Sequence, residues 1–222
     1  SAMAIPLDPN LSRPVTINPA PGSENSLQTE LDNLFGVGVV DAALDQLSIG
    51  MFQIAAPGSD VIAPQLKFEW TANASSQTIG IFGWGGAPVT AQIFSGTQAA
   101  GAYATVAWST LDSGLILSYD SALDSSPTSL AFSGISRDFF GFYFQVGDQK
   151  YYSVDSLNPN NGARVLGYMP TLSGAAFSYE DGSDFDYQDA GFFVESIKPV
   201  PEPLTILLLG LGLIGLAGLR RK

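Results

Sequence analysis

Short apolar stretches with a period of two residues recur over most of the chain. In the stretch FGFYFQV, Phe142, Phe144 and Val146 alternate with Tyr143 and Gln145, as in a strand that buries one face. Glycine, proline, asparagine and aspartate separate these stretches at a spacing of about ten residues, which is typical of antiparallel sandwiches. We therefore predict a mainly β protein with an antiparallel, jelly-roll-like β-sandwich. The predicted strands cover residues 50–56, 64–72, 78–84, 88–94, 105–110, 114–120, 139–146, 150–156, 164–169, 175–180 and 190–197.

A helical pattern precedes these strands. Asn25 or Ser26 can cap this helix and Gly36 can end it. A second short helix is expected at residues 41–46. The proline-rich, polar residues 1–25 predict an extended arm that is either unattached or lies along a partner. The apolar residues that recur at i, i+4, i+7 and i+8 of the first helix are Leu27, Leu31, Leu34 and Phe35.

The C-terminal end of the chain is first apolar and then basic. The residues from Leu204 to Leu219 carry no charge, and as a helix they span about 24 Å at 1.5 Å per residue. Because basic residues flank membrane helices on the cytoplasmic side, we predict a single-pass membrane anchor with a cytoplasmic C-terminus. A helix within the protein core is the alternative. The basic residues are Arg220, Arg221 and Lys222, and Gly212, Gly215 and Gly218 form a smooth face for another membrane subunit.

The chain begins at Ser1, and no apolar signal segment precedes the arm. Since an exported protein needs such a segment, we expect Ser1 to be the mature end left by a signal peptidase. A residue left by removal of an expression tag is the alternative.

Composition narrows the possible chemistry. The chain has no histidine and no cysteine, which excludes histidine general bases, thiol nucleophiles, disulfides and thiolate metal sites. Any bound metal is therefore expected to be a hard cation held by oxygen. With 21 acidic against 9 basic residues the formal net charge is −12, so nucleic acid is not expected as a partner. We predict no catalytic residues and no enzymatic activity.

Acidic residues cluster in the stretch YEDGSDFDYQDAGFFVES. Like charges this close repel one another unless something screens them, and acids around a glycine turn are oxygen ligands of the kind that Ca²⁺ takes. The cluster indicates either a Ca²⁺ site or a solvated acidic hairpin. Asp155, Asn158 and Asn161 are further oxygen ligands that can converge from another strand. The candidate ligands within the cluster are Glu180, Asp181, Asp184, Asp186 and Asp189.

Two further interpretations concern carbohydrates. Trp84 or Trp108, if exposed, can stack on a sugar ring, although core packing is the expected role of the aromatic residues. Carboxylate pairs such as Asp184 and Asp186 are also the residue type that acts on glycosides.

The tail, with Pro201, Glu202 and Pro203 followed by the apolar stretch and the three bases, resembles the PEP-CTERM sorting signal of Gram-negative bacteria. The resemblance implies recognition by a membrane exosortase that cuts near the Pro-Glu-Pro tripeptide, and hence an exported protein. It covers only the end of the chain and implies nothing about the preceding domain.

Several segments of that preceding domain resemble DUF4114-like ectodomains: SLQTELDNLFG, LDQLSIGMFQIA, TIGIFGW, FGFYFQV and YEDGSDFDYQDAGFFVESI. This resemblance implies a β-sandwich without an assigned enzymatic activity. Where that family often carries an acid and a histidine, this chain has Ala163 and Arg164, and Arg164 is expected to oppose a cation. The acidic motif of the family maps onto Glu180, Asp181, Asp184, Asp186, Tyr187 and Asp189.

These observations predict an extended arm at residues 1–25, an extracytoplasmic β-sandwich at 26–198 and a PEP-CTERM-like anchor at 199–222. The predicted function is that of a non-enzymatic, exported, membrane-anchored structural or interaction protein, with its domain in the periplasm or at the cell surface. One alternative is an accessory subunit on the periplasmic face of a photosynthetic or respiratory membrane complex, contacted through the glycine face and the arm. A minor alternative is a surface protein that binds or acts on carbohydrate, with exopolysaccharide as its partner.

Overall fold

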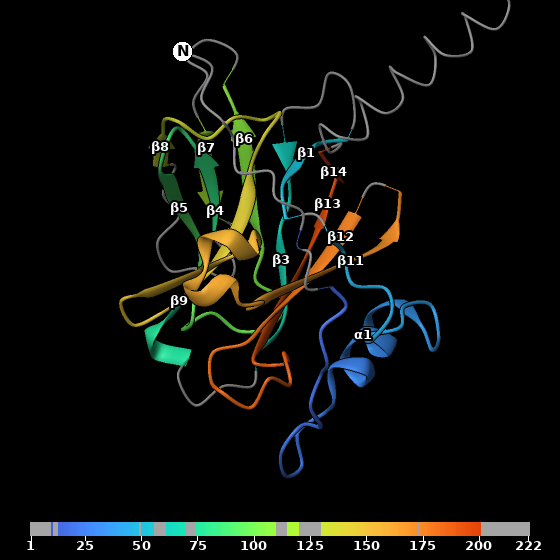
Figure 1. Cartoon of the computed structure of the whole chain (residues 1–222). Coiled ribbons are helices and arrows are strands. Elements are labelled where there is room, and N and C mark those ends of the chain that lie inside the picture. Colours follow the sequence, from blue (N-terminus) through green and yellow to red (C-terminus); the bar gives the residue numbers. More distant parts are fainter. Residues whose placement is uncertain are drawn as a thin grey trace, which may run out of the picture.

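The computed structural model describes residue 10 and residues 13–48, 50–55, 61–69, 74–109, 115–119, 130–172 and 174–200. Within these residues the protein is mainly β, with antiparallel sheets and a single α-helix (Figure 1). The prediction of a mainly β protein with antiparallel sheets is therefore confirmed. Each of the predicted strands overlaps an observed one, because the period-two pattern and its flanking turn residues specify strands locally.

The strands form three four-stranded sheets and one two-stranded sheet, and every pairing is antiparallel. The first sheet has the order β10 (Gln149–Tyr152), β9 (Gly141–Val146), β4 (Gln77–Trp84) and β5 (Pro88–Ser95). The second has the order β11 (Val165–Thr171), β12 (Gly174–Tyr179), β13 (Ala190–Glu195) and β3 (Gln65–Glu69). The third has the order β2 (Val61–Ile62), β6 (Ala104–Trp108), β7 (Leu115–Tyr119) and β8 (Leu130–Phe132). In the fourth, β1 (Phe52–Ile54) pairs with β14 (Ile197–Pro199).

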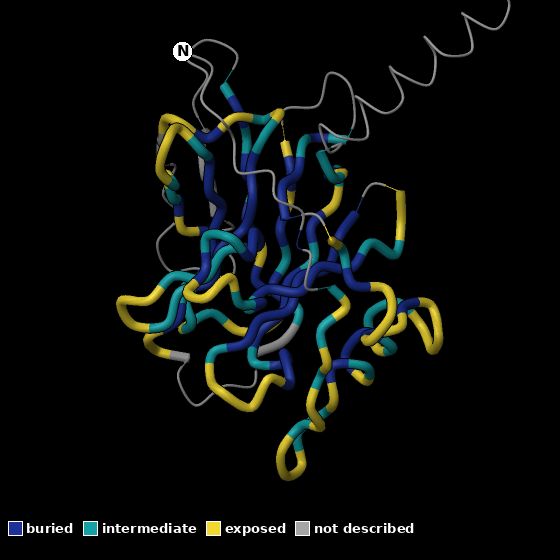
Figure 2. Tube along the Cα trace, viewed as in Figure 1, coloured by how far each residue is buried: buried dark blue, intermediate teal, exposed yellow. Residues whose placement is uncertain are grey.

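The second and third sheets are joined along β3. The Leu66 amide donates to the Ala102 carbonyl at 2.8 Å, and Gln65 forms an isolated bridge with Tyr103. Three short 3-10 helices, Ala74–Ser76, Asp155–Leu157 and Pro159–Asn161, lie in the connections between strands. The main hydrophobic core draws its side chains from all of the sheets, and Figure 2 shows long buried stretches along the central strands.

Aromatic rings from different sheets meet in this core. The Phe142 ring of β9 lies 4.6 Å from that of Phe177 and 5.1 Å from that of Phe192, centroid to centroid. Phe142 and Phe144 therefore face the interior as their alternation predicts. Tyr143 differs, because it is only 3% exposed on the opposite face of the same strand. There it joins a smaller cluster that includes Phe82 and is packed against Tyr152, so β9 is covered on both faces.

The helix α1 (Leu27–Phe35) confirms the predicted helix. The hydroxyl of Ser26 caps it by accepting from the Thr29 amide at 3.2 Å, and it ends at Gly36, whose φ of 99° favours glycine. Leu27 and Leu31 are buried against Tyr168 and Ala176 on the outer face of the second sheet and against Tyr187 in the turn after β12. The helix thus covers part of that face, at the lower right of Figure 1.

The second helix expected at residues 41–46 is wrong, since these residues form turns. The Asp41 carboxylate accepts from the amides of Ala43 and Leu44 at 2.9 and 3.0 Å. A side chain that binds nearby amides in this way offers the backbone an alternative to the helix.

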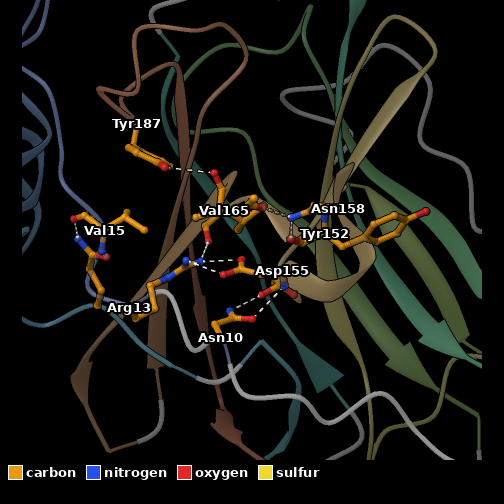
Figure 3. A network of polar contacts seen from close by, with 12 residues as sticks. Asn10, Arg13, Val15, Tyr152, Asp155, Asn158, Val165 and Tyr187 are labelled. Atoms are coloured by element: carbon orange, nitrogen blue, oxygen red, sulfur yellow. Dashed lines mark hydrogen bonds and ion pairs between the residues drawn. The ribbon is translucent and has the colours of Figure 1, made fainter. Parts of the chain in front are cut away.

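The described part of the N-terminal arm lies along the protein's own domain (Figure 3). Asn10 donates to the Ser153 carbonyl at 2.8 Å and accepts from the Asp155 amide at 2.9 Å. Arg13 donates to both carboxylate oxygens of Asp155, at 2.8 and 3.1 Å, and to the carbonyl of Val165 at 2.8 Å. The arm is therefore attached by specific polar contacts to segments that follow it by more than a hundred residues.

The rest of the arm continues these contacts. The side-chain amide of Gln46 accepts from the Val15 amide at 2.8 Å and donates to the Val15 carbonyl at 3.0 Å, as a paired strand would. The Asn18 amide donates to the Phe185 carbonyl at 2.9 Å. Beyond this point the arm reaches α1.

None of the helices in the described residues is long and apolar enough to cross a membrane. The predicted membrane helix from Leu204 to Leu219, with its glycine face and terminal bases, lies outside the described residues, as do Ser1 and the Pro201–Pro203 tripeptide.

Candidate functional site

The acidic residues occupy the turn that joins β12 to β13, at residues 180–189, which we call the acidic turn. In the second sheet Tyr179 pairs with Ala190 beside this turn, and Gly174 pairs with Glu195 at the other end of the two strands. The chain then passes through Ser196 into β14. The acidic turn and β14 therefore lie at opposite ends of β13.

Glu180 is the centre of the acidic turn. Its side chain is fully buried, and its carboxylate accepts from the Gly182 amide at 2.8 Å and from the Tyr187 amide at 3.4 Å. The backbone is wrapped around this carboxylate with Phe185 and Tyr187 in the left-handed region, at φ of 60° and 58°. Residues with a Cβ rarely adopt that conformation, so surrounding contacts have to hold it in place.

Tyr187 supplies one of those contacts. Its ring is buried in the cluster beneath α1, and its hydroxyl donates to the Ala163 carbonyl at 3.1 Å. The arm adds a second, through Asn18 on Phe185. The turn is thus held from the core on one side and from the N-terminal arm on the other.

The five predicted ligands come together as two overlapping groups. Oxygens of Glu180, Asp184 and Asp186 lie within 4.8 Å of one another, and so do oxygens of Glu180, Asp181 and Asp189. Glu180 and Asp186 are buried, whereas Asp184 is exposed. The structure therefore brings together the residues that the sequence indicated, in an all-oxygen arrangement of the kind that suits a hard cation such as Ca²⁺.

Burial raises the pKa values of three of these acids. Loss of hydration raises the pKa of Glu180 to about 7, although the hydrogen bond from the Gly182 amide lowers this pKa. Loss of hydration also raises the pKa of Asp189 to about 8, although the Asp181 amide donates to it at 2.7 Å. The pKa of Asp186 is raised for the same reason. The turn without a cation therefore retains protons near neutral pH, which reduces the repulsion among its carboxylates.

Arg164 contacts the acidic turn from its outer side. Its Nη1 lies 3.9 Å from Glu180 Oε1 and also donates to the Gly182 carbonyl. The guanidinium stacks on the rings of Tyr151 and Phe185, at 5.2 and 4.8 Å from their centroids. The positive charge that was expected to oppose a cation thus lies beside the acids, where it offsets part of their repulsion.

Two glutamines that the sequence analysis did not single out complete the surroundings. Gln77 donates to Asp181 Oδ2 at 2.6 Å. Gln188 donates to both oxygens of Asp186, from its backbone amide at 3.3 Å and from its side chain at 3.2 Å, and its side chain also donates to Glu24. The Oε1 atom of Gln188 is buried without a hydrogen-bond partner in the described structure. No signal in the sequence marks either glutamine, because both act through the folded arrangement.

The further oxygen ligands suggested by the sequence have other roles. Asp155 is paired with Arg13. Asn158 accepts from the Tyr152 amide at 2.6 Å and donates to the carbonyls of Tyr152 and Gly162, each at 2.9 Å, which closes its own loop. Asp155 does not belong to either group of acidic residues that could hold a metal ion in the described part of the chain. Asn161 lies in the same short loop.

Neither of the two tryptophans that were candidates for stacking on a sugar ring is exposed. Trp108 is 5% exposed, its indole nitrogen donates to the Ile135 carbonyl at 2.9 Å, and its ring lies 5.1 Å from that of Phe140. Core packing is therefore its role, and the carbohydrate interpretation of Trp108 is wrong. Trp84 is half-buried at the end of β4.

Comparison with known proteins gives one match. No curated protein and no solved structure matches the chain, so the DUF4114-like resemblance remains an expectation. Residues 199–222, which begin at the last residue of β14, match the family model described as the PEP-CTERM protein-sorting motif. The chain thus carries a PEP-CTERM sorting motif at residues 199–222, which implies an exported, membrane-anchored protein sorted by exosortase.

Proposed function

We propose that the protein is a non-enzymatic interaction protein whose β domain is displayed on the periplasmic or extracellular side of the bacterial inner membrane. A single membrane helix within residues 204–219 holds it there, with the C-terminus in the cytoplasm. The observation that carries this proposal is the PEP-CTERM motif at residues 199–222, which follows directly on a strand of the folded domain.

The connection between domain and motif supports this arrangement. Pro199 pairs with Phe52, and the Val200 amide donates to the Met51 carbonyl at 3.0 Å. This is where the described contacts with β1 end, one residue before the Pro-Glu-Pro tripeptide that begins at Pro201. Cleavage near the tripeptide would consequently release the domain without breaking the β1–β14 pairing.

The position of the acidic turn suggests which surface is used. The strands β12 and β13 each contain six residues, which corresponds to about 20 Å at 3.3 Å per residue. The acidic turn lies at one end of this length and the strand leading to the motif at the other. We infer that the turn is directed away from the membrane, where it can bind Ca²⁺ and contact a partner.

The attachment of the arm bears on the accessory-subunit alternative. That alternative used the arm as a clamp for another subunit, whereas Asn10, Arg13 and Val15 are engaged with the protein's own domain. The described arm therefore gives no support to it, and we retain the self-contained surface domain as our proposal.

Protease accessibility tests the topology. Spheroplasts that carry the protein with an epitope after Lys222 are treated with protease before lysis. We expect the β domain to be digested while a short, membrane-bound fragment with the epitope is protected. Recovery of an intact chain from treated spheroplasts, with the protease active on a periplasmic control protein, would contradict the proposed orientation. Release of the full chain into the soluble fraction would contradict the anchor.

A further inference from the structure

A groove lies beside α1 on the outer face of the second sheet, separate from the acidic turn. Its volume is about 480 Å³, within the range of about 300–1,000 Å³ that is usual for small-molecule sites. Side chains alternate between the two faces of a strand, and the outward-facing residues of β3 and β13 form the floor of the groove. Leu66, Phe192 and Val194 point into the core, so the residues between them point outward.

Those outward residues are polar and aromatic. Gln65 and Lys67 come from β3, and Phe193 and Glu195 come from β13, with Gln65 directly opposite Phe193 in the pairing. The helix α1 covers part of this face and ends at Phe35. The groove is the part of the face that the helix leaves open.

Aromatic rings form its apolar surfaces. Phe35, the last residue of α1, packs edge-on against Phe193 with centroids 5.7 Å apart. Both rings rest on the cluster beneath the helix, so their positions are fixed by the core. Tyr103, which also lines the groove, is 43% exposed, and its backbone is paired with that of Gln65. The groove thus presents two packed rings and one exposed ring to a ligand.

The polar groups offer both donors and acceptors without a net charge. Lys67 Nζ lies 5.9 Å from the centroid of the Phe193 ring and donates to Gln65 Oε1 at 2.5 Å. Glu195, which also lines the groove, carries the opposite charge. In a chain with a formal net charge of −12, this balance favours a neutral ligand over an anion or a cation.

We propose that the groove binds a neutral carbohydrate, with a pyranose ring stacked on Tyr103 or Phe193 and its hydroxyls bound by Gln65, Lys67 and Glu195. A pyranose has an apolar C–H face and a rim of hydroxyls that both donate and accept, which are the two features that the groove provides. A hydrocarbon chain would remove the amide, the ammonium and the carboxylate from water without replacing the hydrogen bonds that they make to it, at a cost in desolvation. This inference names a ligand for the interaction role proposed above and rests on that role.

Calorimetric titration of the full chain in a detergent without sugar head groups tests it, because maltoside and glucoside detergents would compete. The probes are cellotetraose, laminaritetraose and mannotetraose. We expect saturable binding of at least one of them. Replacement Tyr103→Ala should weaken that binding by about three- to tenfold, as expected for loss of one ring contact. Replacement Glu195→Ala should also weaken it, and both positions are exposed enough for the fold to be retained.

The matched control is Val89→Ala, which removes an apolar side chain of similar exposure, 38%, from β5, outside the groove. It should bind the oligosaccharide as the unaltered protein does. Absence of binding for all three probes, with the β fold verified by circular dichroism, would overturn the inference, as would binding that neither Tyr103→Ala nor Glu195→Ala weakens. Either result leaves the protease-protection pattern unchanged, so failure here is distinguishable from failure of the proposed topology.

Discussion

Arg13 and Asp155 form an ion pair that is almost completely withdrawn from solvent. Arg13 Nη1 lies 2.8 Å from Asp155 Oδ2, and the two side chains are 2% and 7% exposed. Both charges have further partners, since Arg13 also donates to Val165 and the Asp155 amide donates to Asn10 (Figure 3). The pair joins the N-terminal arm to the loop after β10, and so connects the two ends of a long segment of chain.

We expect Asp155→Ala to lower the free energy of unfolding by about 3–5 kcal/mol, because it leaves the Arg13 charge buried without its counter-ion. The double replacement of Arg13 and Asp155 by alanine should cost less than the sum of the single ones. Urea unfolding followed by circular dichroism measures both. The control is Arg137→Ala, since Arg137 and Asp138 form a more exposed pair, 3.8 Å apart. A cost for Asp155→Ala no larger than for this control would contradict a structural role for the buried pair.

Stability without metal should fall as the pH rises. Because the pKa values of Glu180 and Asp189 are raised to about 7 and about 8, the folded protein holds protons that the unfolded chain releases near its ordinary carboxyl pKa values. Stability from these groups is then present at low pH and is lost between about pH 4 and pH 8. Thermal unfolding in chelator across this range tests the direction.

Asp189→Asn is the matching variant, because an amide cannot titrate. Its melting temperature should change less between pH 6 and pH 8 than that of the unaltered protein. Asp148→Asn, which alters an exposed acid in the turn between β9 and β10, should keep the original dependence. An Asp189→Asn protein with an unchanged profile would show that Asp189 is not a source of the effect.

Calcium is expected to raise the melting temperature of the protein, and more at pH 8 than at pH 6. The cation offsets repulsion among the carboxylates, and it competes with the protons that they retain at lower pH. Binding to the folded state alone adds about 2.7 kcal/mol at a hundred times the dissociation constant. Melting in millimolar Ca²⁺ and in chelator, at both pH values, measures the difference.

The double variant Asp184→Asn with Asp186→Asn should abolish this calcium effect while the core strands stay folded. A second double variant, Asp138→Asn with Asp148→Asn, removes the same charge from two exposed acids elsewhere and should keep the effect. If the unaltered protein melts identically in calcium and chelator at both pH values, the acidic turn binds no calcium and is held in place by contacts such as those of Glu180 and Tyr187.

Gly80 in β4 should not tolerate a side chain. A Cβ there would lie 2.3 Å from the Ala91 carbonyl oxygen and 2.3 Å from Tyr143 Cε1. We expect Gly80→Ala to cost about 1–3 kcal/mol of unfolding free energy through overpacking. Gly85→Ala, where no atom lies within 4 Å of the new Cβ, is the control in the same urea experiment and should change stability little. Equal stability of the two variants would indicate that β5 and the Tyr143 ring can move aside at little cost.

Local patterns account for the parts of the fold that were predicted. The residues of α1 have a helical period, a capping serine and a terminating glycine in one short stretch, so no distant contact is needed to specify them. The alternation in β9 likewise places Phe142 and Phe144 in the core. It could not show that Tyr143 is also buried, because its cover comes from Phe82 and from the loop that contains Val154. Burial of the second face of a strand depends on what packs there.

The same distinction applies to the candidate site. The acids of the turn were predicted to lie together because they are neighbours in the sequence, and all five do so, in two groups that share Glu180. Gln77 reaches Asp181 across 104 positions, and Arg13 reaches Asp155 across 142. No local pattern encodes such pairs. The arm was consequently predicted as extended, but its contact with its own domain was not.

The short pairing of β14 with β1 has a mechanical consequence for a tethered protein. Any pull exerted through the membrane segment enters the folded domain at Val200 and is first resisted by the three paired residues of β14. Behind them Ser196, with a φ of 63°, separates this pair from the long strand β13, which is bonded on both sides. Tension can therefore separate β14 from β1 and lengthen the connection between the domain and the membrane. The strand β13, and with it the second sheet, stays intact.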